Sequence, residues 1–164
     1  MSSQQGNLDL LNDPVAQELL HSTIPARLAY IATDGRPRVI PIWFHWTGDE
    51  IVFGTPTTAP KTKSVASDSP VAVTIDSNNW PYKVLQIRGK AQVETVEGVV
   101  PEYAAAAHRY FGEEQGAGWV QQVGSLFSHM TRIAVRPDWV GILDFEQRFP
   151  SAIANAMAGA QAAD

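Results

Sequence analysis

The chain has 164 residues, of which 45% are hydrophobic and 18% charged, a composition typical of one soluble globular domain. Its net charge of −5 argues against a general binder of nucleic acid or anionic membranes, because such proteins normally carry a basic face. The absence of cysteine excludes disulfides, thiolate nucleophiles and cysteine-ligated metal sites. We therefore expect neither a nucleic-acid partner nor a membrane partner.

The N-terminal residues MSSQQGNLDL contain no basic segment followed by an apolar one, so the sequence predicts no secretory signal. No stretch reaches the ~20 apolar residues of a membrane span, and we expect a cytoplasmic protein. Residues 1–12 are polar and are expected to be flexible. The segment NDPVAQELLHS then predicts a short helix, with Asp13 as its cap and Pro14 at its first position.

From residue 24 onward the pattern is that of strands. Four segments, at residues 24–33, 36–46, 50–55 and 70–76, are separated by turns such as DG at 34–35 and TGDE at 47–50. A fifth strand over residues 83–95 alternates apolar and polar side chains, and a last strand over residues 131–145 is interrupted at RPD. Pro137 in this last strand predicts an edge, a bulge or a kink.

Between the last two strands, residues 97–114 are alanine-rich and predict a helix, and residues 117–130 predict a second one. The hairpin spacing of the six strands favours an antiparallel sheet that closes on itself. The predicted fold is mainly β (α+β), a six-stranded antiparallel β-barrel with peripheral helices. It comprises a flexible N-terminus (1–12), one domain (13–149) and a C-terminal tail (150–164) that we expect to be frayed.

Catalysis by side chains has little support in the sequence. The four histidines, at positions 21, 45, 108 and 129, have no metal-ligand spacing, so we predict no metal site. The motifs of a nucleophile elbow, a P-loop and a dinucleotide-binding fold are absent, and no acid–base pair stands out. If the protein is an enzyme, a bound cofactor carries the chemistry, and no catalytic side chain is predicted.

The segment TPTTAPKTKSV, at residues 55–65, places hydroxyl groups and two lysines at the end of a strand. Residues 61–69 are compatible with two helical turns, and a helix N-terminus next to Lys61 and Lys63 suits a phosphate. The alternative is a solvated turn. In the preceding strand, Pro41 removes a ladder donor and indicates an edge, a bulge or a place where the backbone faces a ligand. Trp43 and Phe44 either border a flat heterocycle or belong to the core.

The ordered set GRPRVIPIWF, TGDE, IVFGT, KTKSV, SPVAVTID and VLQIRGKAQV resembles the flavin-binding split β-barrel family of pyridoxamine 5'-phosphate oxidase, from about residue 24 to residue 93. The resemblance implies a split barrel and a homodimer with the cofactor at the subunit interface. It also implies an oxidoreductase that transfers hydride between the cofactor and a small organic substrate. The cofactor would be flavin mononucleotide (FMN) or, in one branch, the 8-hydroxy-5-deazaflavin coenzyme.

Carried onto this sequence, the resemblance implies four sets of cofactor contacts. The ring contacts lie along one strand, at Arg38, Ile40, Pro41, Ile42 and Trp43, and the following strand contributes Gly54 and Thr55. The phosphate contacts are Lys61 and Lys63, and the contacts in and after a later loop are Trp80, Tyr82 and Val84.

The sequence also departs from the oxidase. Pro60 stands where the oxidase has an arginine, and the oxidase's C-terminal substrate-binding region has no match, so oxidation of vitamin B6 is not expected. The loop NNWPYKV is more similar to the deazaflavin-using branch. The predicted function is an FMN-dependent oxidoreductase. The alternatives are a deazaflavin-dependent reductase, a non-catalytic flavin-binding or carrier protein, and a barrel without a ligand.

Overall fold

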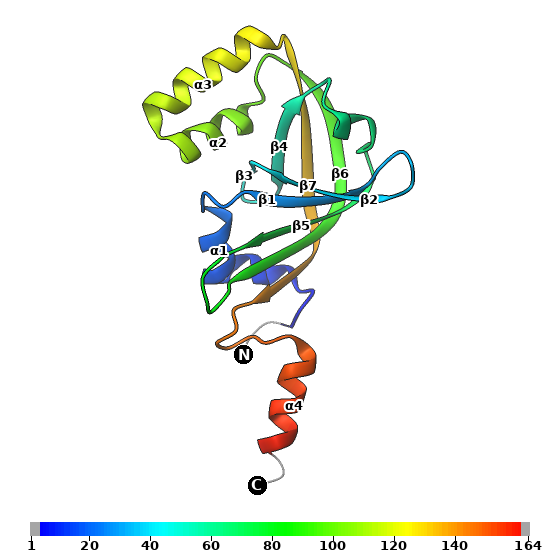
Figure 1. The fold of residues 1–164 in the computed structure, drawn as a ribbon, viewed down its shortest axis with the longest axis vertical. Helices are drawn as coiled ribbons and strands as arrows, with labels where there is room; N and C mark the ends of the chain where they lie inside the picture. The colour runs from blue at the N-terminus through cyan, green and yellow to red at the C-terminus, as the bar shows by residue number, and fades with distance from the viewer. Residues whose placement is uncertain (1–3, 162–164) are drawn as a thin grey trace.

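The structure, a computed structural model, describes residues 4–161. Its centre is an antiparallel sheet of seven strands in the order β2-β1-β5-β6-β7-β4-β3, with the helices around it (Figure 1). The strands are β1 (Ala26–Ile31), β2 (Pro37–Ile42), β3 (His45–Trp46), β4 (Ile51–Pro56), β5 (Pro70–Asp76), β6 (Val84–Glu97) and β7 (His129–Leu143). The helices are α1 (Pro14–Leu20), α2 (Pro101–Phe111), α3 (Glu113–Leu126) and α4 (Ser151–Gln161), with 3-10 turns η1 (Leu8–Asn12) and η2 (Pro60–Lys63).

The predicted antiparallel fold with peripheral helices is confirmed, with one change in the strands. The segment at residues 36–46, predicted as a single strand, forms two strands on opposite edges of the sheet. The chain leaves β2 after Ile42 and joins β4 as β3 at His45, so Trp43 and Phe44 cross between the two edges. Phe44 is 1% exposed, and its burial in the core fixes the crossing.

A β-bulge interrupts the pairing of the two longest strands, β6 and β7, at Pro137, where the sequence predicted an irregularity. Arg88 of β6 pairs with Trp139 of β7, and Gly89 pairs with Pro137, so Asp138 is the extra residue. A Cβ atom on Gly89 would lie 2.4 Å from the carbonyl oxygen of Arg136, so only glycine allows this approach. The prediction of an edge, a bulge or a kink at Pro137 is thus met by a bulge.

The N-terminal segment packs against the barrel, although the sequence predicted flexibility over residues 1–12. The backbone N–H of Gly6 donates to Val140 at 2.7 Å, and Leu10 is 1% exposed in the core beside Leu19 and Leu20 of α1. The apolar anchor that makes this possible is Leu10, which lies within a polar stretch. Residues 1–3 lie outside the described part of the chain.

Two helical parts extend from the barrel (Figure 1). Helices α2 and α3 form a hairpin beside β4, and α4 points away from the opposite end of the barrel. The tail was predicted to be frayed, but Ser151–Gln161 is helical, with all of its residues exposed; residues 162–164 lie outside the description. Within residues 4–161, none of the helices has the length and apolar character needed to cross a membrane.

Candidate functional site

Strand β2 forms an open edge of the sheet and carries the first group of predicted cofactor contacts. Ile40 and Ile42 pair with Leu28 and Ala26 of β1 and pack against the core. Pro41 is exposed on the other face of β2, which agrees with the expectation that it suits an edge strand. The backbone of this strand is therefore open to a ligand along its outer edge.

Arg38 lies at the end of β2 that is next to the β1–β2 turn. Its guanidinium donates to the Asp34 carboxylate at 2.8 Å. The backbone N–H of Arg36, together with the Arg38 side chain, holds the pKa of Asp34 below its usual value. Because both side chains are about half exposed, Arg38 keeps access to solvent and to a ligand.

The lysine loop, residues 57–69, connects β4 to β5 and contains both predicted phosphate ligands. The two helical turns expected over residues 61–69 are wrong, because the segment forms a single 3-10 turn, Pro60–Lys63. A turn this short has no useful dipole, so a phosphate seat here depends on side chains. The Thr62 hydroxyl lies 2.7 Å from the Ala59 carbonyl, and the Thr33 N–H donates to Ser64 at 3.3 Å. These contacts fix the loop beside the β1–β2 turn.

Lys61 differs from an ordinary surface lysine in its burial. It is half-buried, and burial lowers the pKa of its ammonium group below the usual value. Within residues 4–161, neither Lys61 nor the exposed Lys63 lies within 4.0 Å of a carboxylate, whereas Lys83 pairs with Glu18 at 2.5 Å. A partly desolvated cation without a protein counter-charge suits an external anion. The residues of this loop therefore fit the phosphate of the implied cofactor.

Gly54 and Thr55, the next predicted contacts, lie on β4 opposite Arg132 and Thr131 of β7. Helix α2 covers Gly54, since a Cβ atom there would lie 2.6 Å from the Cβ atom of Tyr103. Thr55 is only 3% exposed. In the single chain both residues are covered by protein, and Gly54 has a packing role of its own.

Trp43 belongs to an aromatic cluster that the sequence did not reveal. Its ring stacks on Tyr110 of α2, with centroids 4.8 Å apart and planes 15° apart. The other members surround it edge-on or tilted; the cluster comprises Trp43, Tyr103, Tyr110, Phe111 and Trp119. Three members, on α2, were visible in the sequence only as residues at helical spacing, and they lie at least 60 positions from Trp43 in the chain.

Arg109 of α2 holds this cluster against the barrel. Its Nε atom donates to the Ser22 carbonyl at 3.0 Å, and Nη2 donates to the carbonyl of Phe44. Its Nη1 atom lies 3.5 Å from Nδ1 of His45. Burial, followed by the Arg109 charge, lowers the pKa of His45, which favours the neutral imidazole. In its place beside Trp43, Arg109 is a structural anchor.

Trp80, Tyr82 and Val84 form a second group at a distance from the first. Trp80 is 67% exposed and Tyr82 42%, and their rings lie 5.5 and 6.0 Å from that of Phe145. With Val84 and the end of β5, Tyr82 and Phe145 line a hollow of about 470 Å³. The lysine loop precedes β5 and this group follows it, so the seven residues of the strand, about 20 Å, separate the two groups. Within one chain, Lys61 and Trp80 therefore lie beyond opposite ends of β5.

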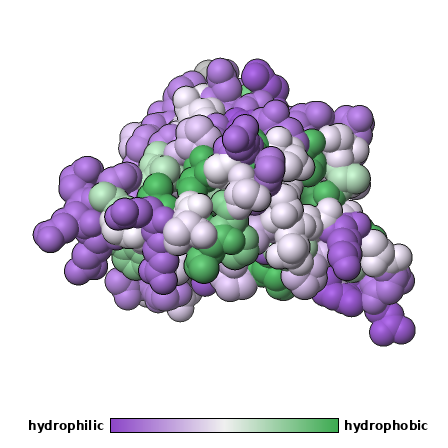
Figure 2. Space-filling view, turned by 90° about the horizontal axis from the view of Figure 1, so that it is seen from above, coloured by the Kyte–Doolittle hydropathy of each residue, from purple (hydrophilic) through white to green (hydrophobic). Residues whose placement is uncertain are grey.

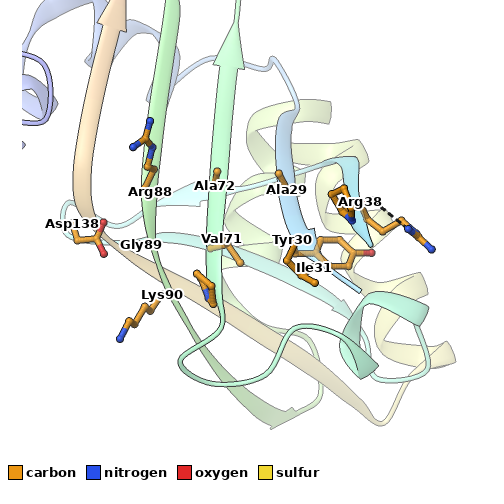
Figure 3. Close-up of a pocket in the computed structure, with 12 residues that line it drawn as sticks. Ala29, Tyr30, Ile31, Arg38, Val71, Ala72, Arg88, Gly89, Lys90 and Asp138 are labelled. Atoms are coloured by element: carbon orange, nitrogen blue, oxygen red, sulfur yellow. Dashed lines mark hydrogen bonds between the residues drawn. The ribbon is translucent and has the colours of Figure 1, made fainter. Parts of the chain in front are cut away.

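The outer face of the sheet carries a larger hollow between these two groups, with a volume of about 520 Å³ (Figure 3). Its lining combines apolar side chains with three basic residues and the carboxylate of Asp138, and Figure 3 shows Ala29, Ala72 and Arg88 on neighbouring strands. The guanidinium of Arg88 lies 4.0 Å from the centroid of the Trp139 ring. We name this surface the outer hollow; its main residues are Ala29, Ile31, Arg38, Ala72, Arg88 and Lys90. A planar apolar group with negative charges matches this lining.

Comparison with solved structures gives several proteins with the same fold. A protein described as an F420 reductase is 24% identical, with a TM-score of 0.56 over 76% of this chain and 94% of its own. A conserved hypothetical protein from Mycobacterium tuberculosis is 17% identical, with a TM-score of 0.66 over 87% and 91%. The heme storage protein from Vibrio cholerae is 15% identical, with a TM-score of 0.58 over 79% and 93%. At these identities the likeness establishes the fold alone.

No curated protein gives a significant match to the chain. The family of pyridoxamine 5'-phosphate oxidase, in contrast, matches residues 13–143, which extend from the cap of α1 to the end of β7. This match covers the whole barrel and both groups of predicted cofactor contacts. The chain therefore belongs to the pyridoxamine 5'-phosphate oxidase family.

Proposed function

We propose that the protein is an oxidoreductase that binds FMN, or alternatively the 8-hydroxy-5-deazaflavin coenzyme, and acts on a small organic substrate. The half-buried Lys61, which lacks a carboxylate partner among residues 4–161, carries the proposal. Family membership supports a flavin, and the similar F420 reductase supports the deazaflavin alternative. The bound cofactor would supply hydride transfer.

The chain's own residues would bind and orient this cofactor. Lys61 and Lys63 would hold its phosphate, and the open edge of β2 at Ile40–Ile42 would contact the ring. Arg38 would add a positive charge beside the ring. Trp43 would border it at the end of β2, where Tyr110 fixes the indole plane.

We further propose that two copies of the chain form a homodimer and share each cofactor site. The supporting observation is the separation of Trp80, Tyr82 and Val84 from Lys61 by the length of β5. The second copy would bring its Trp80 loop and its outer hollow against the lysine loop of the first. The exposure of Trp80 and Ile31, at 67% and 53%, agrees with surfaces that another chain covers.

The first test is cofactor titration of the purified protein, with FMN and the deazaflavin coenzyme separately, followed by absorbance and fluorescence. Lys61→Ala removes a charge-assisted contact worth about 1.5–3 kcal/mol, so the dissociation constant should rise roughly 10- to 150-fold. Arg136→Ala is the matched control, because it removes one positive charge from a 69% exposed position outside these groups. The proposal would be contradicted if Lys61→Ala and Arg136→Ala bound the cofactor with equal affinity. It would also be contradicted if the protein bound heme but neither FMN nor the deazaflavin coenzyme.

The shared site is tested by mixing two defective variants, Lys61→Ala and Trp80→Ala. If each site takes Lys61 from one chain and Trp80 from the other, a heterodimer contains one intact site and one doubly altered site. An equimolar mixture that has exchanged subunits should then regain tight binding in roughly a quarter of its sites. A mixture that binds no better than its two components, or a protein that sediments as a monomer with cofactor bound, would refute the shared site.

A further inference from the structure

The α2–α3 hairpin carries a second hollow, separate from the outer hollow, with a volume of about 290 Å³. Its lining is Phe111 at the end of α2, together with Gln115, Trp119 and Gln122 of α3. The three α3 residues stand at i, i+4 and i+7 and therefore share one helix face. None of the four side chains is charged. We call this surface the hairpin hollow.

The aromatic walls of the hairpin hollow are partly exposed to solvent. Phe111 is 41% exposed and Trp119 36%, and their centroids lie 6.0 Å apart with planes at 70°. The indole N–H of Trp119 donates to the Tyr103 hydroxyl at 2.8 Å, so its single donor is already used. Trp119 therefore offers a ligand its π face, and the amides of Gln115 and Gln122 supply the hydrogen-bonding groups of the lining.

The hairpin that carries this surface is held rigidly against the barrel. Arg132 of β7 donates to Glu102 at 2.7 Å, and the Tyr110 hydroxyl donates to the Ile24 carbonyl at 3.2 Å. Helix α3 approaches α2 closely at Gly116, where a Cβ atom would lie 2.8 Å from the Cα atom of His108. Because its walls are already in place, the hollow can bind a ligand with little loss of conformational entropy.

Trp43 connects the hairpin hollow to the strand of the proposed cofactor site. Its ring centroid lies 4.9 Å from that of Phe111 and 6.5 Å from that of Trp119. In sequence it directly follows Ile42, the last residue of β2. Seen from above, apolar residues reach the surface in the middle of this side of the molecule, with hydrophilic residues around them (Figure 2).

From these observations we infer that the hairpin hollow binds the substrate, and that the substrate is a neutral planar ring compound with a polar group at its edge. Because the Phe111 and Trp119 planes stand at 70°, one ring would stack on its plane and the other would contact its edge, and the two glutamine amides would bond its polar group. A phosphorylated or carboxylated substrate does not fit, since an anion would be desolvated without a cation in the lining. Two carboxylates, Glu113 and Glu114, stand in the adjoining first turn of α3. Naming this ligand as the substrate rests on the proposed function.

The test compares 2-naphthamide, which is neutral, with 2-naphthoate, its anionic analogue of the same ring size. Equilibrium dialysis measures both dissociation constants, in the cofactor-free protein and in the cofactor-loaded protein. We expect the amide to bind at least about tenfold more tightly than the carboxylate. Trp119→Ala should weaken amide binding about tenfold or more, through loss of ring contact. Leu126→Ala is the matched control, because it truncates a 66% exposed apolar residue of α3 outside the lining.

A second variant, Gln122→Glu, keeps the shape of the hollow and adds one negative charge. It should weaken naphthoate further, while Lys61→Ala should leave naphthamide binding by the cofactor-free protein unchanged. Tight cofactor binding that requires Lys61, together with naphthamide binding that Trp119→Ala does not change, would overturn this inference and leave the proposed function standing. Naphthamide binding that requires Trp119 in a protein that binds no cofactor would support the hollow as a ligand site and refute the proposed function. Dissociation of a dimer by Trp119→Ala, without naphthamide binding, would assign the surface to a second copy and overturn the inference.

Discussion

The packing of α2 on β4 can be tested with the substitution Gly54→Ala. The added Cβ atom would lie 2.6 Å from the Cβ atom and 3.2 Å from Cγ of Tyr103, against an ordinary contact of 3.4 Å or more. The Tyr103 Cβ atom cannot rotate away, because it is attached directly to the helix backbone. Helix α2 would have to shift, but Arg109 and Arg132 bind it to the barrel. Overpacking of this kind costs about 1–3 kcal/mol.

Urea unfolding followed by far-ultraviolet circular dichroism measures this loss directly, and Gly118→Ala provides the control. Gly118 lies in α3 with no atom within 4 Å of an added Cβ, so the same substitution there should stabilise the protein by about 0.5–1 kcal/mol. The two variants should therefore change the free energy of unfolding in opposite directions. Equal effects of the two substitutions, or a Gly54→Ala protein as stable as the unaltered one, would show that Tyr103 does not cover Gly54.

Three further predictions concern ion pairs and buried polar groups. Burial opposes ionisation of Glu102, but hydrogen bonds from Arg132 hold its pKa below the ordinary value. The stability that this pair contributes is thus complete above the unfolded-state pKa and is lost as the pH falls through the lower folded-state pKa, so Glu102→Gln should lower the urea midpoint at pH 7, and this difference should shrink as the pH is lowered. Asp144, 6% exposed, accepts the backbone N–H groups of residues 146–148. Asp144→Ala should therefore destabilise the protein by about 1–3 kcal/mol, and an unchanged urea midpoint would contradict this. Arg109→Lys, which cannot keep both carbonyl contacts, should cost about 1.5–3 kcal/mol and change the emission of Trp43; equal stability would argue against the anchor.

The strands were the most predictable part of the fold, because their pattern is local. In β6 the alternation of Leu85 and Ile87 with polar neighbours matches the observed burial of every second residue from Leu85 to Ala91. Pro137 indicated the irregularity in β7 for an equally local reason, the absence of an N–H group. The sequence alone could not show that Gly89 faces Pro137, because that pairing depends on the register between β6 and β7.

The turn between β2 and β3 shows where local patterns fail. Residues 36–46 were predicted as one strand, yet Phe44 enters the core and the chain continues on the opposite edge of the sheet. The segment itself contains no signal for this crossing, because the crossing depends on the pairing of β3 with β4 and of β4 with β7. The same holds for Leu10, whose burial depends on the far side of the barrel.

In the candidate site, too, the sequence predicted single residues but not how residues far apart in the chain are arranged. Family resemblance predicted that Lys61 and Trp80 contact one cofactor, but within one chain they lie beyond opposite ends of β5. The sheet is too well paired to bend there, since every residue of β5 pairs with β6. In the proposed homodimer the two residues of one site would come from different chains, with the lysine loop of one copy opposite the Trp80 loop of the other. The exposed Trp80 ring is then the residue whose environment should change most when the dimer dissociates.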